Sequence, residues 1–466
     1  MLHRLATLVC LLAVLAALPA CGRNPFSALR PEGYAFPTDF VWGVAVAAHQ
    51  VEGGNDKNDW WAWEQKPGAI KGGDKSGDGV AFAKTYAADA ALARGLGQTA
   101  FRLSLEWSRI EPERGRRNPA AIKYYHDVLA ALKANGLRPF VTLMHFTLPT
   151  WVSDQGGWED ERTLADFEAY SAFCAKEFGA EVDDWITINE PNVYAFNSYD
   201  GHEWPPGKQN RQAAMRVMGA QMVGHARSAA ALRKHDTVAF WGGQACRVGI
   251  ANHLIVIDPA NGLNPLEHAR AFFEDRIFNE AFLEAVRTGV FIADMPGAGK
   301  VEVRDAGLKD SVDFVGINYY RRVLVNGLDG PRTAAVGAPT NDLGWEINPD
   351  GLYRILRRVS AQKLPIYITE NGTADASDKF RARFIVQHLM RVWQAIDAGI
   401  PVKGYFHWSL MDNFEWAEGY SARFGLYRVD FSKSNRSREV TKGAEVYGAI
   451  CKANKLTPDL IRQFGL

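Results

Sequence analysis

Short apolar runs recur along the chain and alternate with longer stretches in which apolar residues return every three or four positions. The short runs are typical of buried parallel strands, and the longer stretches are typical of amphipathic helices. The predicted strands are 41–47, 100–105, 138–144, 185–189, 238–241, 314–317, 366–369 and 404–407. The predicted helices are 120–134, 164–178, 213–235, 269–288, 349–362 and 380–398. This alternation predicts an α/β fold, a single (β/α)8 TIM barrel.

Gly- and Pro-rich segments interrupt the alternation. They occupy residues 53–79, 203–210, 293–299 and 326–341. We interpret them as loop insertions, several of which should wall a pocket at the carboxyl ends of the barrel strands. Because neither a linker nor an internal repeat follows residue 30, we predict one catalytic domain over residues 34–466.

The first residues have the composition of an export signal. Met1 to Arg4 is weakly basic and precedes an apolar run from Leu5 to Leu18. Leu18-Pro19-Ala20-Cys21 resembles a bacterial lipobox, which predicts a signal peptide over 1–20, a lipid on Cys21 and a tether over 21–33. Ordinary cleavage nearby and a retained anchor are the alternatives. Gly22 replaces the Asp that favours inner-membrane retention, so we expect an outer-membrane lipoprotein facing the periplasm or the surface, and otherwise a periplasmic protein.

Charge and composition narrow the partners. Lys and Arg number 53, Asp and Glu also number 53, and the formal net charge is zero. This balance argues against nucleic acid and against membrane contact other than through Cys21, and it fits a neutral substrate. The 14 Trp residues suit sugar binding, although a large core would give the same count. Cys174, Cys246 and Cys451 show no metal-site spacing, so we expect buried thiols and neither a disulfide framework nor a metal or cofactor.

Two glutamates end apolar, β-branched runs that break at once into Pro or Gly. They are Glu190, within residues 186–192, and Glu370, within residues 367–372. A parallel barrel gathers the carboxyl ends of its strands around one pocket, so these carboxylates should converge. Paired carboxylates in a pocket indicate cleavage of a glycosidic bond. Taken singly, each glutamate could equally be a helix cap or a surface carboxylate.

The two motifs resemble those of glycoside hydrolase family 1, the retaining β-glycosidases. The resemblance covers about residues 36 to 431. Further matching stretches are Phe40-Val41-Trp42-Gly43, Phe101-Arg102-Leu103-Ser104, Gly316-Ile317-Asn318-Tyr319-Tyr320 and His407-Trp408-Ser409-Leu410-Met411-Asp412-Asn413-Phe414-Glu415-Trp416. It implies that Glu190 is the acid/base and Glu370 the nucleophile of an exo-acting enzyme that uses no cofactor.

The resemblance also assigns supporting residues. Asn189 would bind the sugar 2-hydroxyl, and Arg102 and Tyr320 would contact Glu370 and favour its ionised form. Asn318 belongs to the same supporting group. The charge of Glu370 and partial burial should keep Glu190 protonated.

A sugar-binding platform follows from matching positions. Gln50 would bridge the 3- and 4-hydroxyls, His145 would bind the 3-hydroxyl and Glu415 would take the 4- and 6-hydroxyls. Trp408 would stack on the sugar, and Trp416 would add an N–H donor. Considered alone, His145 and Trp408 are more often core residues.

Two departures from the family pattern bear on the kind of substrate that the enzyme would bind. Phe146-Thr147 stands where many members have Trp-Asp, which affects the leaving-group side of the pocket. The phospho-glycosidase branch carries Ser, Lys and Tyr where this chain has Glu415, Ala422 and Phe424. Because a carboxylate would repel a phosphate, we expect unphosphorylated substrates.

The sequence therefore predicts a retaining β-glycosidase, foremost a β-glucosidase, acting on small β-glycosides or short oligosaccharides through a covalent intermediate. Two alternatives remain at this point. A transglycosylase would use the same site with a sugar acceptor, and a catalytically silent sugar-binding lipoprotein would keep the barrel without the reaction. The sequence does not distinguish among glucose, galactose and fucose, nor does it indicate an oligomeric state.

Overall fold

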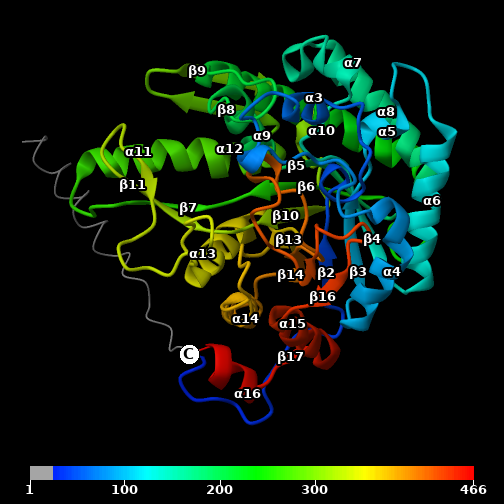
Figure 1. Cartoon of the computed structure of the whole chain (residues 1–466). Helices are drawn as coiled ribbons and strands as arrows, with labels where there is room; N and C mark the ends of the chain where they lie inside the picture. Colours follow the sequence, from blue (N-terminus) through cyan, green and yellow to red (C-terminus); the bar gives the residue numbers. More distant parts are fainter. Residues whose placement is uncertain (1–24, 466) are drawn as a thin grey trace, which may run out of the picture.

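Eight parallel strands close into a barrel in the computed structural model, which describes residues 25–465 (Figure 1). Around the barrel the order is β2, β3, β4, β5, β6, β10, β13 and β14, which pairs again with β2. Their bounds are β2 Val41–Ala45, β3 Ala100–Ser104, β4 Arg138–Met144, β5 Asp184–Asn189, β6 Arg247–His253, β10 Phe314–Asn318, β13 Ile366–Asn371 and β14 Val402–Trp408. The predicted (β/α)8 fold is confirmed.

One predicted strand is wrong. Residues 238–241 form no strand, with a bend at 240 and 241, and the fifth barrel strand is β6 further along the chain. The sequence of β6 intersperses Gly and Ala with two larger apolar residues and ends in Asn and His, so it has no continuous apolar run. Phe240 and Trp241 instead donate their backbone N–H groups to the Asp183 carboxylate, at 2.9 and 2.7 Å.

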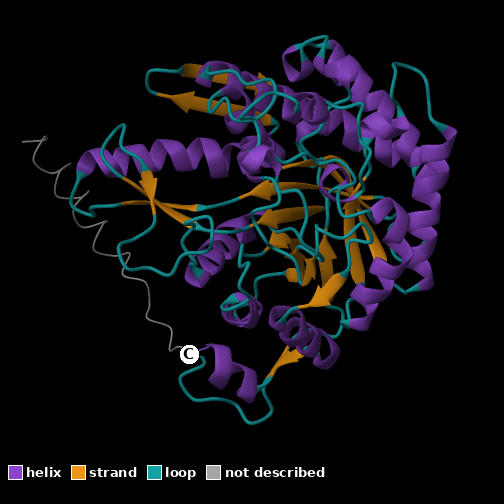
Figure 2. Ribbon diagram, in the orientation of Figure 1, coloured by secondary structure: helices purple, strands orange, loops and turns teal. Residues whose placement is uncertain are grey.

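Helices surround the strands (Figure 2). The longer ones are α4 Phe82–Gly95, α6 Pro119–Ala134, α8 Arg162–Phe178, α10 Arg211–His235, α13 Pro349–Val359, α14 Arg381–Asp397 and α15 Lys442–Ala453. The shorter ones are α2 Ala48–Val51, α3 Asp59–Glu64, α5 Trp107–Ile110, α7 Thr150–Ser153, α9 Pro191–Tyr199, α11 Pro265–Asp275, α12 Ala281–Thr288 and α16 Pro458–Leu460. The helix predicted over 269–288 is α11 and α12 joined by a π-helical turn. The sequence did not predict α4 and α15.

The chain also forms smaller β-sheets that are separate from the barrel. A three-stranded sheet contains β7 Val256–Pro259, β11 Arg322–Val325 and β12 Arg332–Thr333. The hairpin of β8 Val290–Met295 and β9 Gly299–Arg304 occupies the segment predicted as the loop 293–299. Two further pairs are β15 Tyr427–Val429 with β16 Arg438–Val440, and β1 Tyr34–Ala35 with β17 Lys455–Leu456.

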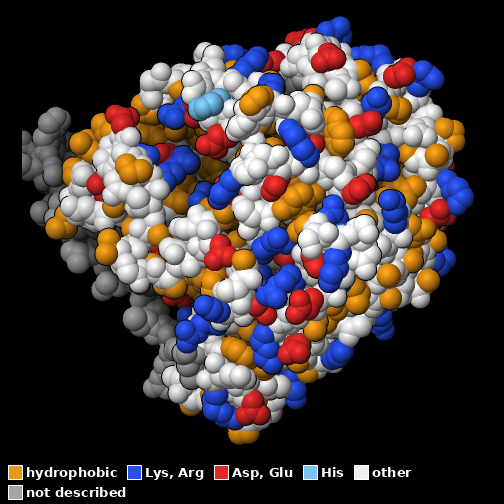
Figure 3. Space-filling view, viewed as in Figure 1, with side chains coloured by type: hydrophobic (Ala, Val, Ile, Leu, Met, Phe, Trp, Pro, Cys, Tyr) orange, Lys and Arg blue, Asp and Glu red, His pale blue; other side chains and the backbone are white. Residues whose placement is uncertain are grey.

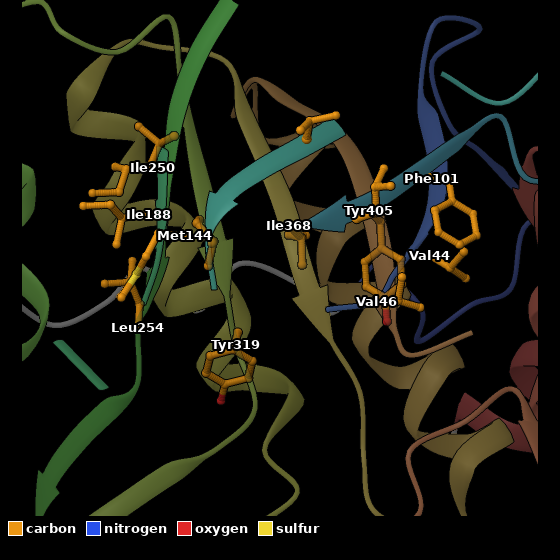
Figure 4. Close-up of a cluster of buried hydrophobic side chains, with 14 of the residues drawn as sticks. Val44, Val46, Phe101, Met144, Ile188, Ile250, Leu254, Tyr319, Ile368 and Tyr405 are labelled. Carbon is orange, nitrogen blue, oxygen red and sulfur yellow. The ribbon is translucent and has the colours of Figure 1, made fainter. Parts of the chain in front are cut away.

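Buried side chains cover both faces of the barrel strands, inside the barrel and outside it. Inside the barrel, the ring of Phe140 lies 4.8 Å from that of Phe406 and 5.2 Å from that of Tyr367. The strand of Phe140, β4, borders neither β14 nor β13, which carry the other two rings. The opposite face packs against the surrounding elements. Labelled members of this outer cluster in Figure 4 include Val44, Phe101, Ile188, Ile250, Ile368 and Tyr405. Burial on both faces explains the near-continuous apolar character of most of the strands.

An ion cluster ties together the amino ends of three neighbouring strands. The buried Asp184 carboxylate, at the start of β5, accepts hydrogen bonds from Arg138 at the start of β4 and Arg247 at the start of β6. Burial raises the pKa of Asp184, whereas both guanidinium groups lower it. The cluster lies at the end of the barrel opposite to the strand exits, where interactions serve stability.

The described part of the predicted tether packs against the barrel domain. Phe26 is buried, and its ring lies 4.7 Å from Tyr34 and 5.9 Å from Trp393. The signal peptide and Cys21 lie outside the described residues. Within residues 25–465, no helix is long and apolar enough to cross a membrane.

Two expectations from composition can be compared with the fold. Cys174, Cys246 and Cys451 are buried free thiols, as predicted. On the face shown in Figure 3, acidic and basic side chains are interspersed, which fits the net charge of zero.

Candidate active site

Both predicted carboxylates reach one cavity of about 330 Å³ at the carboxyl ends of the barrel strands. Glu190 directly follows β5 and caps α9, with a backbone φ of 44° in the left-handed region. Such a conformation is uncommon for a residue with a side chain and costs about 1 to 3 kcal/mol, a strain typical of functional sites. Glu370 lies near the end of β13, and both side chains are buried.

Glu370 receives two strong hydrogen-bond donors. Arg102 Nη1 lies 2.5 Å from Oε1, and the Tyr320 hydroxyl donates to Oε2 at 2.6 Å. Burial nevertheless raises the pKa of Glu370 to about 7, with Arg102 opposing the rise, Glu190 adding to it and Tyr320 opposing it. The sequence identified the groups that favour ionisation, but not the larger effect of burial.

Glu190 contacts an amide and an imidazole instead. Asn318 Nδ2 donates to its Oε1 at 2.7 Å, and His253 Nδ1 lies 3.2 Å from the same oxygen. The hydroxyl of Thr369 donates to Asn318 Oδ1 at 2.7 Å and so turns the amide N–H groups toward Glu190. The two carboxyl groups thus differ in their partners, because a cation and a phenol favour the ionised form of Glu370 and neither of them contacts Glu190.

Arg102 contacts both Glu370 and Asn189, the residue before Glu190. Besides Glu370, its guanidinium donates to Asn189 Oδ1 at 2.6 Å and to Thr142 Oγ1 at 3.2 Å. Asn318 Nδ2 also donates to Asn189 Oδ1, at 3.0 Å. The amide oxygen of Asn189 thus accepts two hydrogen bonds, and its N–H group is directed to a different partner.

The side-chain N–H group of Asn189 fixes the tautomer of His145. Asn189 Nδ2 lies 3.1 Å from His145 Nε2, so this nitrogen acts as acceptor and the proton sits on Nδ1. Burial and the charge of Arg102 hold the pKa of His145 well below its usual range, so the ring is neutral. Nδ1 is buried with no partner among the described residues, and His145 lines the cavity. It can donate to a sugar hydroxyl.

Gln50 and Glu415 lie together at the far end of the site. Gln50 Nε2 donates to Asn413 Oδ1 at 3.0 Å, to the Phe414 carbonyl at 2.9 Å and to Glu415 Oε2 at 3.3 Å. Gln50 Oε1 has no partner among the described residues. Burial, with a smaller effect from the charge of Glu370, raises the pKa of Glu415 to about 8.

Aromatic rings form the walls. Trp408 and Trp416 both line the cavity, and the ring of His145 stacks on each with centroids 6.0 Å apart. Phe146 packs against Trp416 at 5.2 Å and against Trp204 at 4.8 Å. The predicted residues Arg102, Asn189, Asn318 and Gln50 lie beneath this lining and bond to the side chains that form it.

The sequence did not single out several residues of the site. His253 was missed because its strand, β6, was placed wrongly, and Trp204, Arg321 and Trp345 also line the cavity. Thr147, by contrast, turns away and donates to the buried Glu106 carboxylate at 3.0 Å. The Phe146-Thr147 departure therefore changes the cavity wall through Phe146 alone. Among residues 25–465 no group of three or more His, Cys, Asp or Glu side chains could hold a metal ion.

The family model described as glycosyl hydrolase family 1 matches residues 33–456. The chain belongs to that family. Beta-glucosidase A of Thermotoga maritima is 34% identical, over 90% of this chain and 98% of that protein. A beta-galactosidase of Pyrococcus woesei is 31% identical, over 91% of this chain and 98% of its own length.

Solved structures agree with this membership. A beta-glycosidase from Pyrococcus horikoshii superposes with a TM-score of 0.84 at 34% identity, covering 93% of this chain and 99% of that one. The protein is thus a family 1 β-glycosidase, an O-glycosyl hydrolase, and the alternative of a silent sugar-binding barrel is set aside.

Proposed function

We propose that this family 1 enzyme is an exo-acting, retaining β-glycosidase that acts mainly on unphosphorylated β-glucosides. The observation that carries the proposal is the contrast between the two carboxyl groups of the cavity. Glu370 is held by the Arg102 cation and the Tyr320 hydroxyl, whereas Glu190 is held by the Asn318 amide. A retaining glycosidase needs this difference, because one group must carry a charge and the other a proton.

The reaction follows from these states. The Glu370 carboxylate attacks the anomeric carbon while Glu190 transfers its proton to the departing oxygen, so the glycosidic bond breaks as a glycosyl ester forms. Ester formation removes the charge of Glu370, and Glu190 is then an ionised base. It takes a proton from water, whose oxygen attacks the anomeric carbon and releases Glu370. A sugar acceptor in place of water would give transglycosylation.

Sugar recognition rests on unpaired polar atoms near these carboxyl groups. The Nδ1–H of His145 and the Oε1 of Gln50 have no partner among the described residues, and Glu415 adds an acceptor beside Gln50. Trp408 offers a flat face in the same cavity. A pyranose that presents hydroxyls at one edge and C–H bonds on its face matches this arrangement.

Exo action is supported by the closed end of the cavity. Trp416 is buried and packs against Trp60 at 4.7 Å and Trp204 at 5.8 Å between ring centroids. A packed aromatic wall of this kind favours a terminal sugar over a polysaccharide chain that runs through the site.

The preference for an unphosphorylated sugar is supported by the groups at the same end. Ala422 and Phe424 are buried in the apolar cluster that contains Trp408. Neither can bind a phosphate, and an ionised Glu415 would repel one.

We also propose that the mature protein is a lipoprotein anchored through Cys21 and exported to the outer membrane. The lipobox-like sequence before Cys21 supports the proposal. Intact-mass measurement of the mature amino terminus tests it, with a diacylglycerol adduct on Cys21 expected. An unmodified chain that begins at or after residue 21 would refute it.

A panel of nitrophenyl β-glycosides that differ at the 4- and 6-positions tests the enzymatic proposal. We expect the β-glucoside to give the highest kcat/KM and the first sugar released to be the β-anomer. Release of the α-anomer would contradict a retaining mechanism. A preference for a 6-phosphorylated substrate would contradict the assignment of the sugar end.

A further inference from the structure

Arg321 lies on the wall of the catalytic cavity, one residue after the Tyr320 that binds Glu370. Its side chain is half-buried, and its guanidinium carbon lies 4.7 Å from the ring centroid of Trp345. The Trp345 ring in turn packs against Tyr320 at 5.8 Å and Phe424 at 6.2 Å. A cation therefore faces the cavity on an aromatic support, next to the reacting carboxyl groups.

Arg321 makes no hydrogen bond and no ion pair with any residue of the described chain. Two other arginines near it, Arg322 and Arg332, each form an ion pair with a glutamate. Arg322 contacts Glu346 at 2.7 Å, and Arg332 contacts Glu274 at 2.9 Å. Burial, with a smaller effect from the positive charge of Arg332, lowers the pKa of Arg321 to about 10. The fold thus holds a partly desolvated cation without a compensating charge, which is unfavourable unless a ligand supplies one.

None of the acidic groups of the same cavity pairs with Arg321, and all except Glu203 have other partners. Glu190 and Glu370 are hydrogen-bonded as described, Glu415 contacts Gln50 at 3.3 Å, and Glu418 pairs with Lys71 at 2.8 Å. Glu203 lines the cavity as an exposed side chain and forms no ion pair with Arg321. The counter-charge for Arg321 must therefore come from the bound molecule.

Glu415 and Trp408 line the cavity and are assigned to the sugar together with Gln50 beneath them, and we assign Arg321 and Trp345 to the leaving-group side. Val193, Phe196 and Phe278 give the cavity an apolar stretch of wall. An apolar wall with one unpaired guanidinium fits a flat, apolar leaving group that carries an anionic substituent.

We propose that Arg321 binds a carboxylate on the leaving group, so that the preferred substrates are β-glycosides of aromatic carboxylic acids joined through a phenolic oxygen. This inference rests on the proposed β-glycosidase function. The carboxylate takes no part in bond breaking. Only the C–O bond at the anomeric carbon is cleaved, and Glu190 protonates the phenolic oxygen.

Two substrates of nearly the same shape separate charge from size. They are 4-carboxyphenyl β-glucoside and 4-carbamoylphenyl β-glucoside, and kcat/KM is measured for each with the native enzyme and with Arg321→Met. The change in the ratio of the two kcat/KM values is the readout, because differences in leaving-group reactivity cancel. A charged hydrogen bond contributes about 1.5 to 3 kcal/mol, which corresponds to roughly 10- to 150-fold.

We expect Arg321→Met to lower kcat/KM for the carboxylate by about 10-fold or more and for the carboxamide by less than about twofold. Arg332→Met is the matched control, since its guanidinium lines the same cavity but is paired with Glu274. It should leave the ratio near the native value. The melting temperature of Arg321→Met should change little, because only the contact with the Trp345 ring is lost and no hydrogen bond or ion pair.

Equal losses on both substrates, an unchanged ratio, or the same change of ratio in Arg332→Met would overturn the role of Arg321. Hydrolysis of 4-nitrophenyl β-glucoside by the native enzyme identifies which claim has failed. If that neutral substrate is hydrolysed but the ratio does not depend on Arg321, only this inference is wrong. If no β-glucoside is hydrolysed, the proposed function fails and the inference fails with it.

Discussion

Arg102 donates a hydrogen bond of 2.5 Å to Glu370, and both side chains are almost wholly buried. Arg102 belongs to β3 and Glu370 to β13, which are separated by β14 and β2 in the barrel. The contact therefore forms only when the barrel has closed, and the charge of Glu370 depends on the complete fold.

The pH dependence of activity should report the hydrogen bonds to Glu370. Tyr320→Phe removes the hydroxyl that donates to Oε2, and this hydroxyl lowers the pKa of Glu370. Without it the pKa rises, so the carboxylate becomes ionised only at higher pH. We expect the acid limb of kcat/KM to move up by about one pH unit, since a charged hydrogen bond contributes about 1.5 kcal/mol or more.

Tyr319→Phe provides the matched control for this shift. The Tyr319 hydroxyl donates to the Asn348 carbonyl at 2.7 Å and does not contact Glu370. Its loss should leave the acid limb in place. A limb that moves equally in both variants, or that moves to lower pH in Tyr320→Phe, would show that the phenol does not stabilise the ionised nucleophile.

Glu190→Ala should affect substrates according to their leaving groups. A dinitrophenolate leaves with little protonation, whereas an alkyl sugar requires it, and general acid catalysis contributes about 10² to 10⁴ in rate. We expect the glycosylation rate to fall severely for cellobiose and mildly for dinitrophenyl β-glucoside, as measured by pre-steady-state kinetics. Comparable losses on both substrates would rule out Glu190 as the acid.

Glu415→Ser should weaken recognition of the sugar 4- and 6-positions. Loss of a buried hydrogen-bond partner costs about 1 to 3 kcal/mol, so kcat/KM should fall about 5-fold or more on glucosides and less on xylosides, which lack the 6-hydroxyl. Glu418→Ser is the control, because its carboxylate pairs with Lys71. If glucosides and xylosides lose the same factor, Glu415 does not bind the 6-hydroxyl.

Asp184→Asn should destabilise the barrel without changing the chemistry. The substitution leaves Arg138 and Arg247 without their shared carboxylate. We expect a loss of about 3 kcal/mol in the free energy of unfolding, the lower end for a broken buried pair because both guanidinium groups are partly exposed. Urea unfolding measures the loss. A large fall in kcat at temperatures where the variant is folded would contradict a purely structural role.

The sequence revealed Glu190 and Glu370 because each ends an apolar strand, a pattern that depends on local residues alone. His253 escaped notice because β6 has Gly, Ala and Asn where other strands have large apolar residues. The pKa of Glu370 could not be predicted either, since it depends on how deeply the closed barrel buries the carboxylate. The unpaired state of Arg321 is likewise a property of distant neighbours.

Azide rescue of Glu370→Ala is the most direct measurement of the proposed catalytic roles. Removal of the carboxylate should abolish nearly all turnover and leave a space from which azide can attack the anomeric carbon of dinitrophenyl β-glucoside. We expect azide to restore activity and the product to be the α-glycosyl azide, whereas the same treatment of Glu190→Ala should give the β-azide. A β-azide from Glu370→Ala, or near-native turnover without azide, would show that Glu370 is not the nucleophile.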